Sequence, residues 1–197
     1  VKNEHRLNAV DRIGFTIHEH EIVGIAGVAG NGQKELAEAL TGLIPWSAGE
    51  VIFNGEHLES PSVKGLIDKG IAHIPENRMK SGLAGSLGVV ENLLLKSYRS
   101  KGRAKYGVLN KKQNEQWANS LVKSFDVRTP DLQSPVGQLS GGNQQKLLFA
   151  REIDLEPKLM IAVHPTQGLD VAATEAVHKM LLERRRAGSG VLLISED

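Results

Sequence analysis

The sequence contains no cysteine, few aromatic residues and no long apolar segment. The absence of cysteine from its 197 residues excludes a disulfide framework, a thiolate zinc or iron–sulfur site and a cysteine nucleophile. Aromatic residues make up 4% of the chain, which does not favour the base-stacking platforms of proteins that bind single-stranded nucleic acid. The longest apolar stretch, residues 22–30, is far shorter than the roughly 18 residues of a membrane-spanning helix. We therefore expect a soluble domain.

Charge of one sign is not in excess either. Lysine and arginine number 24, and aspartate and glutamate number 23, which gives a formal net charge of +1. No overall basic field points to nucleic acid, so we expect no nucleic-acid partner. The length predicts one domain, with room for a small additional lobe.

Glycine is abundant, with 21 residues, and three glycines follow the first expected strand. A β pattern at residues 15–17 and 22–25 leads into Gly27, Gly30 and Gly32, and a helix-forming run follows. The helix is expected at residues 34–40, with a stop at Gly42. Short strands are expected at 50–53 and 71–74, and Asn54-Gly55 is typical of a tight hairpin turn. The first third of the chain therefore indicates an α/β fold.

The middle of the chain changes to a helical pattern. Helices are expected at residues 90–98 and 111–125, the second with apolar residues three and four positions apart. The basic run between them, residues 100–105, is interpreted as a solvated loop without chemistry.

The last third returns to the α/β pattern. A helix from Ser140 to about residue 153 precedes a continuous apolar run at 159–163, which is suited to a buried strand. A helix at 170–186 and a strand at 191–194 follow. Because the chain ends three residues after this strand, we expect it to be part of a longer polypeptide.

The glycine loop, residues 27–32, is the first candidate for chemistry. Backbone N–H groups at a helix N-terminus hold phosphate, although glycines at this spacing also serve ordinary tight turns. The spacing is that of a P-loop, G-x-x-x-x-G-K-[ST], but Gln33 stands at the lysine position and Lys34 at the hydroxyl position. Consecutive helical residues point about 100° apart, so Lys34 is not expected to replace a lysine at position 33.

The second candidate is the segment Leu139-Ser140-Gly141-Gly142-Asn143-Gln144-Gln145-Lys146, which we call the signature segment. Local physics alone makes Ser140 a helix N-cap and the glycines a hinge. The whole string, however, matches the signature of ATP-binding-cassette (ABC) transporter ATPases, and nearly the whole chain resembles that family.

The resemblance implies a fold and an order of motifs. The fold would be α/β, a P-loop NTPase-like core sheet flanked by helices, with an inserted α-helical lobe. Residues 1–87 would hold Walker A and the Q-loop, 88–142 the helical signature lobe, and 143–197 Walker B, the D-loop and the switch. The implied nucleotide-binding residues are Gly27, Gly30, Asn31, Gly32, Gln33, Lys34 and Glu35. The implied later motif residues are Glu76 in the Q-loop, Gly168, Leu169 and Asp170 in the D-loop, and Ser195-Glu196-Asp197 at the switch.

Five positions depart from the family pattern, whereas the signature segment is intact. Besides Gln33 and Lys34, Val163 stands at the usual magnesium-binding aspartate and His164 at the glutamate that orients water. Glu196 replaces the switch histidine. The resemblance therefore implies no intact catalytic residue and no metal site in this chain.

Together with the run Gly30-Asn31-Gly32-Gln33-Lys34-Glu35-Leu36 and with Pro75-Glu76-Asn77-Arg78, this combination resembles the second cassette of the two-cassette ATPases that serve bacterial importers of simple sugars and nucleosides. Ser140, Gly141, Gly142 and Gln144 would then complete, in trans, an ATP site of the first cassette, which would bind most of the Mg²⁺. The implied partners are that first cassette on the same polypeptide, membrane permease subunits and, indirectly, a solute-binding protein. The implied location is cytoplasmic, peripheral at the inner face of the cell membrane.

Two activities are compatible with this resemblance, a weak ATPase and a non-hydrolysing cassette that donates its signature. The five departures favour the second, so we expect negligible hydrolysis by the isolated chain. A P-loop kinase or GTPase is an alternative on the glycine loop alone. A DNA-repair or chromosome-organising ATPase would need long heptads or zinc-binding cysteines, neither of which is seen in the sequence.

The histidines other than His164 are interpreted as ordinary side chains, because none of them has the helical spacing of a metal pair. They are His5, His18, His20, His57, His73 and His178.

An apolar set near the Q-loop is a candidate docking surface for a helix of a membrane partner. It consists of Leu83, Val89, Val90, Leu93 and Leu94. We expect part of this set to be exposed.

Overall fold

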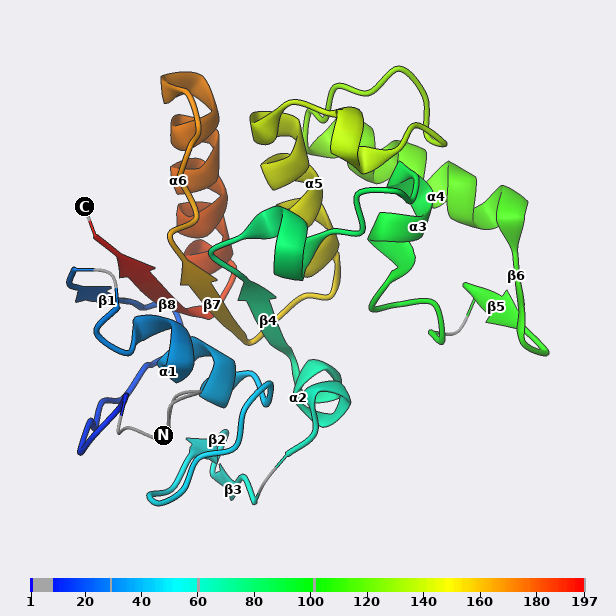
Figure 1. Cartoon of the computed structure of the whole chain (residues 1–197). Coiled ribbons are helices and arrows are strands. Elements are labelled where there is room, and N and C mark those ends of the chain that lie inside the picture. Colours follow the sequence, from blue (N-terminus) through cyan, green and yellow to red (C-terminus); the bar gives the residue numbers. More distant parts are fainter. Residues whose placement is uncertain (2–8, 29, 60, 101, 197) are drawn as a thin grey trace. The chain divides into compact units, whose positions relative to one another are not determined.

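The computed structural model describes residue 1 and residues 9–28, 30–59, 61–100 and 102–196 (Figure 1). Two compact units make up the chain. The core unit comprises Val1–His73, Pro157–His164 and Arg184–Asp197, and the helical unit comprises Ile74–Glu156 and Pro165–Glu183. The expected division into an ATP-binding core at residues 1–87, a helical signature lobe at 88–142 and a continued core at 143–197 stays a prediction.

The core unit is built on a four-stranded sheet with the order β1-β8-β7-β4. Its strands are β1 (Ile22–Ala26), β4 (Ile71–Ile74), β7 (Leu159–Val163) and β8 (Gly190–Ser195). β8 pairs in parallel with β1, from Ile22↔Val191 to Ala26↔Ser195, and with β7, from Leu159↔Gly190 to Val163↔Ile194. The carboxyl ends of β1, β8 and β7 therefore meet at one edge, which is where ligands bind in open parallel sheets.

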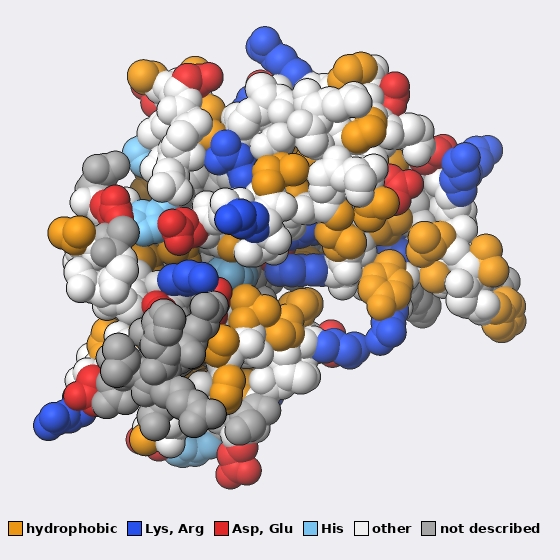
Figure 2. Space-filling model, viewed as in Figure 1, with side chains coloured by type: hydrophobic (Ala, Val, Ile, Leu, Met, Phe, Trp, Pro, Cys, Tyr) orange, Lys and Arg blue, Asp and Glu red, His pale blue; other side chains and the backbone are white. Residues whose placement is uncertain are grey.

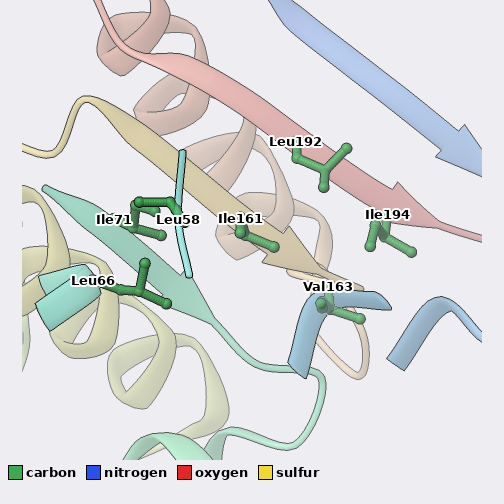
Figure 3. Packing of buried hydrophobic residues seen from close by; sticks show 8 residues of the cluster. Leu58, Leu66, Ile71, Ile161, Val163, Leu192 and Ile194 are labelled. Atoms are coloured by element: carbon green, nitrogen blue, oxygen red, sulfur yellow. The ribbon is translucent and has the colours of Figure 1, made fainter. Parts of the chain in front are cut away.

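Apolar residues of β7 and β8 form the centre of the core (Figure 3). Ile161 and Val163 on β7 and Leu192 and Ile194 on β8 are all at most 2% exposed. Such continuous apolar runs are expected of strands that are covered on both faces. The cluster is completed by Ala37, Leu58, Leu66 and Ile71. Each fully buried aliphatic side chain contributes about 1.5–3 kcal/mol.

The remaining elements of this unit are α1 (Gln33–Leu40), α2 (Val63–Lys69) and the two-stranded hairpin β2 (Ile52–Phe53) and β3 (Glu56–His57). Asn54 and Gly55 both have positive φ angles, 50° and 78°, so the predicted tight turn is confirmed. Helix α2 was not predicted; its seven residues begin after the Ser62 N-cap and end before Gly70, which has φ 93°.

The first expected strand pattern is only partly correct. Residues 22–26 form β1, but residues 15–17 form no strand. Phe15 is 40% exposed, and Ile17 instead lies against Gly190, where an added Cβ would be 2.9 Å from its Cγ2. The apolar character of Ile17 thus serves packing against the start of β8 rather than strand pairing.

The helical unit contains four α-helices in the described residues, α3 (Val89–Leu94), α4 (Lys111–Ser124), α5 (Gly141–Asp154) and α6 (Val171–Arg186), the last of which ends in the core unit. Short turns precede two of them, the π-helical η1 (Arg78–Gly82) and the 3-10 turn η2 (Val136–Gln138). The expected helices at 111–125, 140–153 and 170–186 are confirmed, whereas that at 90–98 is shorter than expected.

The interpretation of residues 100–105 as a solvated loop is wrong for Arg103. Lys101 lies outside the described residues, and Ala104–Lys105 forms β5, which pairs with β6 (Val108–Leu109). The Arg103 guanidinium carbon lies 3.4 Å from the Trp117 ring centroid, and its Nη2 is 3.6 Å from Asp154. Figure 2 shows apolar side chains gathered over the hairpin, where Tyr106 is 95% and Val108 72% exposed.

The apolar set near the Q-loop is not exposed, so that expectation is wrong. Leu83, Val89, Val90, Leu93 and Leu94 are all at most 6% exposed. α3 packs against both α4 and α5, which covers its apolar side chains within the helical unit. No helix in the described part of the chain combines the length and apolar character that crossing a membrane requires.

Candidate functional site

The glycine loop connects β1 to α1 at the carboxyl edge of the core sheet. Gly30 and Gly32 have positive φ angles, 86° and 92°, and Gly32 is the N-cap of α1 without a side-chain cap. The first intrahelical bond runs from Leu36 N–H to the Gly32 carbonyl, 2.9 Å. The amides of Gln33, Lys34 and Glu35 precede it and therefore have no acceptor within the helix.

The side chain of Gln33 closes this loop on itself. Its Oε1 accepts the backbone N–H of Asn31 at 3.0 Å, and its Nε2 donates to the Val28 carbonyl at 2.9 Å. Asn31 Nδ2 also donates to that carbonyl, at 3.0 Å. Gln33 is 8% exposed, and a Cβ on Gly27 would be 2.9 Å from its Nε2. The Gln33 side-chain oxygen thus accepts the Asn31 N–H, a backbone donor that a phosphate-binding loop would offer to its ligand.

Lys34 and Glu35 do not compensate for the missing lysine. Lys34 is exposed, and its Nζ lies 3.7 Å from Glu38 Oε1 one turn along α1. Glu35 lies in the first turn, where a carboxylate stabilises the helix dipole and repels an anion. The start of α1 therefore offers backbone amides to an anion, but neither Lys34 nor Glu35 supplies a positive charge that faces the glycine loop.

A close backbone approach makes Gly32 necessary. An added Cβ there would overlap the carbonyl oxygen of Ala9, whereas at Gly30 it would meet nothing within 4 Å. The segment before β1 therefore packs directly on the end of the glycine loop.

We expect Gly32→Ala to lower the free energy of unfolding by more than Gly30→Ala does. Both positions have left-handed backbone, where an alanine costs roughly 1–2 kcal/mol, but only Gly32→Ala adds a steric overlap. Urea unfolding of both variants measures the difference. Equal losses would contradict the close approach of Ala9.

Three other positions that depart from the family pattern, Val163, His164 and Glu196, lie at or directly after the ends of β7 and β8 at the carboxyl edge of the core sheet. Val163 is 2% exposed and belongs to the apolar cluster with Ala37 of α1, so its position offers no metal ligand. His164 follows in left-handed conformation, φ 43°, and its N–H donates to the Ile194 carbonyl at 2.8 Å. The Gly27 N–H bonds to the Ser195 carbonyl at 3.3 Å, and Glu196 is exposed. Asp197 lies outside the described residues.

In the helical unit, the signature segment begins α5 with an exposed serine. Ser140 Oγ accepts two hydrogen bonds from Asn143, from the backbone N–H at 3.4 Å and from Nδ2 at 2.9 Å. Asn143 is itself fixed, because its Oδ1 accepts the N–H of Arg128 at 2.8 Å. A hydroxyl has two acceptor sites and one donor, so Ser140 keeps its proton for a third group.

The two glutamines of the signature segment have structural contacts instead. Gln144 Nε2 donates to the carbonyls of Val136 and Leu139, at 3.2 and 3.0 Å. Gln145 Nε2 donates to the Pro165 carbonyl at 2.7 Å. Both side chains are buried, so we do not expect Gln144 to reach a nucleotide directly.

The Q-loop and D-loop residues lie in the same unit. Glu76 is exposed and lies two residues before η1. Gly168 has φ 68°, Leu169 N–H bonds to the Thr166 carbonyl at 3.2 Å, and Asp170 Oδ1 accepts the Ala173 N–H at 2.7 Å. Asp170 therefore has a local role at the start of α6. Arg78, for which the sequence predicted no separate role, joins these segments.

A buried ion cluster lies within the helical unit. Glu152 is fully buried, with Lys96 Nζ 2.6 Å from its Oε2 and Arg151 Nη2 2.9 Å from its Oε1. Burial alone would raise the pKa of Glu152, but the ammonium of Lys96 and the guanidinium of Arg151 outweigh it, so the pKa lies below its ordinary value. Arg151 Nη1 also donates to the Gly82 carbonyl at 2.7 Å. These groups serve structure rather than chemistry.

The described histidines form no metal site. His20 Nδ1 bonds to the Arg185 carbonyl at 3.1 Å and His57 Nδ1 lies 3.3 Å from Glu50, while His5 lies outside the described residues. No three side chains of metal-binding type come together in the described ranges.

Comparison with known proteins identifies the family. The family model described as ABC transporter matches residues 10–167, about four fifths of the chain. The chain belongs to the ABC transporter family. This ABC chain is 46% identical over 195 residues to the guanosine import ATP-binding protein NupO of Bacillus subtilis, a match that covers 99% of the chain and 38% of NupO. It is 42% identical over 193 residues to the glucose import ATP-binding protein TsgD13 of Haloferax volcanii, covering 97% of the chain and 35% of TsgD13.

The ABC chain is thus little more than a third as long as these relatives. A third one, the ribose import ATP-binding protein RbsA of Clostridium perfringens, is 33% identical over 197 residues, which are 100% of the chain and 39% of RbsA.

Solved structures confirm the expected fold. The ATP-binding cassette MJ0796, in a dimeric post-hydrolysis state bound to ADP and Pi, matches with a TM-score of 0.76 at 24% identity, covering 96% of the chain and 80% of its own. A nucleotide-free ATP-binding cassette from an ABC transporter matches with a TM-score of 0.77 at 19% identity, covering 95% and 75%. The ABC ATPase fold, with a parallel sheet flanked by helices, is therefore correct, and the kinase or GTPase alternative is set aside.

Proposed function

We propose that this chain is the second, degenerate cassette of a two-cassette ATP-binding protein that serves an importer of simple sugars or nucleosides. Its function would be to donate the signature segment to the ATP site of the first cassette. The relatives above are import ATP-binding proteins for guanosine, glucose and ribose, and the chain covers only 35–39% of their lengths. Their remaining length is sufficient for a further cassette.

The closed glycine loop carries this proposal. Gln33 occupies the Asn31 amide, the first turn of α1 holds Glu35, and Val163 is built into the core. These residues fit a magnesium nucleotide poorly, because a phosphate would have to displace Gln33 and no carboxylate stands at the end of β7. We derive no hydrolytic step at this loop and propose negligible hydrolysis by this chain.

The signature segment, in contrast, suits an anion. Ser140 is exposed and keeps its hydroxyl proton, while the first amides of α5 lack intrahelical acceptors. Both donors favour a phosphate group brought by another cassette, as the helix dipole does. ATP with Mg²⁺ at that partner site would supply the free energy of transport.

The partners follow from this assignment. They would be the first cassette of the same polypeptide, membrane permease subunits and, indirectly, a solute-binding protein. The location would be cytoplasmic, peripheral at the inner face of the cell membrane.

We expect the purified chain to bind labelled ATP weakly and with little dependence on Mg²⁺. Gln33→Lys combined with Lys34→Ser should tighten binding at least about tenfold, because a hydrogen bond to a charged group contributes about 1.5–3 kcal/mol. Titration with and without Mg²⁺ measures both effects, and Lys34→Ser alone is the matched control. A micromolar, magnesium-dependent dissociation constant for the unmodified chain would contradict the proposal. So would ATP turnover that disappears in His164→Ala.

Asn143→Asp should lower the ATPase activity of the full-length protein by about tenfold or more. A carboxylate at this position only accepts hydrogen bonds, so the Ser140 hydroxyl would turn toward it and lose its donor role. Steady-state ATPase of the assembled transporter measures the change. Gln138→Glu, which adds the same charge two residues before Ser140, is the control for electrostatic repulsion. An equal loss in both variants would reject the orientation of Ser140 by Asn143.

A further inference from the structure

Arg78 joins three segments of the helical unit. It is the first residue of η1, and its Nε donates to Gln144 Oε1 of α5 at 3.3 Å. Its Nη1 donates to the Gln167 carbonyl, just before α6, at 3.1 Å. The planar guanidinium directs these two donors apart, which an ammonium group cannot reproduce.

The bond to Gln144 extends to the chain just before the signature. Gln144 has its amide nitrogen on the carbonyls of Val136 and Leu139, so its oxygen is the remaining polar atom of the side chain. Arg78 occupies that oxygen. The guanidinium thus fixes the side chain of Gln144. That side chain in turn holds Val136 and Leu139, before and at the start of the signature segment, against the first turn of α5.

Gly141 leaves the space in which the guanidinium lies. A Cβ at this position would be 2.7 Å from Arg78 Nη2. A cation beside the N-terminus of α5 is unfavourable for the helix dipole, so stabilisation of α5 does not explain its place. The glycine and the arginine instead fit as one arrangement at the exposed end of the signature segment.

The position of η1 is fixed at both ends. Asn77 Oδ1 accepts the N–H groups of Met79 and Lys80, at 3.2 and 2.9 Å, and so sets the start of the turn. At its end the Gly82 carbonyl accepts Arg151 Nη1 of α5. The backbone that carries Arg78 is therefore held on α5. This fixes the position from which its guanidinium donates to the Gln167 carbonyl.

We propose that Arg78 is a positioning residue, which sets the orientation of the signature segment by tying Gln144 to the Gln167 carbonyl. This inference rests on the proposed donation of Ser140 to the partner ATP site. Loss of the tie would let the first turn of α5 rotate away from the segment before α6. The placement of Ser140 at the partner ATP site, which turnover needs, would be disturbed more than the initial binding of ATP.

The test uses the full-length protein in the assembled transporter. Arg78→Met should lower kcat by about ten- to a hundredfold, the loss typical of a small misplacement of a reacting group, and change KM for ATP less than twofold. Arg78→Lys should not restore kcat. Gln167→Ala keeps the accepting carbonyl and Lys80→Gln changes an exposed neighbour in η1, so both should retain normal turnover.

Hydrogen exchange in the same full-length variants gives a readout independent of activity. Arg78→Met should speed exchange over residues 139–145 and leave α4 unchanged. Unchanged exchange at 139–145, or recovery of kcat in Arg78→Lys, would overturn the positioning role. If exchange rises as expected while Ser140→Arg has normal ATPase activity, the positioning holds and the donation of the signature fails.

Discussion

Replacing Ser140 by arginine in the full-length, assembled protein should lower ATPase activity by at least about a hundredfold, as loss of one preorganised donor typically does. The exposed hydroxyl stands at the N-cap of α5, and its two acceptor sites are already occupied by Asn143. An arginine would remove the donor and fill the space of a partner phosphate. Steady-state phosphate release measures the effect.

The same assay separates the role of the glycine loop from that of the signature segment. Gln33→Ala should change ATPase activity less than about twofold, because the closed loop would not take part in turnover. Ser120→Arg, the same substitution at an exposed serine of α4, controls for the bulk and charge of arginine. Equal losses in Ser140→Arg and Gln33→Ala would refute the asymmetry.

Glu152→Gln should lower the free energy of unfolding by about 3–5 kcal/mol, because it leaves the charges of Lys96 and Arg151 uncompensated in the interior. The substitution keeps the volume of the side chain, so a cavity does not account for the loss. Urea unfolding at neutral pH measures it. Glu175→Gln on the exposed face of α6 is the matched control.

The sign of the pH dependence follows from the lowered pKa of Glu152. Its contribution to stability is complete above the ordinary carboxyl pKa of 4.5 and is lost as pH falls through the lower pKa of the folded state. The stability difference between the native protein and Glu152→Gln should therefore narrow only below about pH 4.5. A difference that is constant down to the acid transition would contradict the ion cluster.

Much of the fold could be predicted because its signals are local. The apolar run at β7, the Asn54-Gly55 turn and the Ser140 cap each specify their own backbone with little help from distant residues. Ile17 shows the limit, because an apolar residue that packs on Gly190 has the same pattern as a short strand. Burial of Leu93 and Leu94 could not be read from α3 alone, since α4 and α5 supply the cover.

The candidate site was predictable in its positions but not in its contacts. Spacing placed Gln33 at the lysine position of the loop, yet a side-chain amide that bonds back to Val28 and to Asn31 depends on rotamers that a motif does not encode. The contacts of Arg78 were not predicted, because its partners lie 66 and 89 residues away. A signal was present in the neighbouring glycine, since Gly141 leaves room for the guanidinium.

The hydrogen bonds from Gln33 to Asn31 and Val28 also affect how the stability of this domain depends on the concentrations of ATP and ADP in a cell. A protein that binds a ligand only when folded gains stability as ligand concentration rises above the dissociation constant. A loop whose amide is already satisfied by its own chain gains little in this way. The melting temperature of this chain should then change little with the ratio of ATP to ADP, so that the fraction of folded chain would not depend on the nucleotide supply.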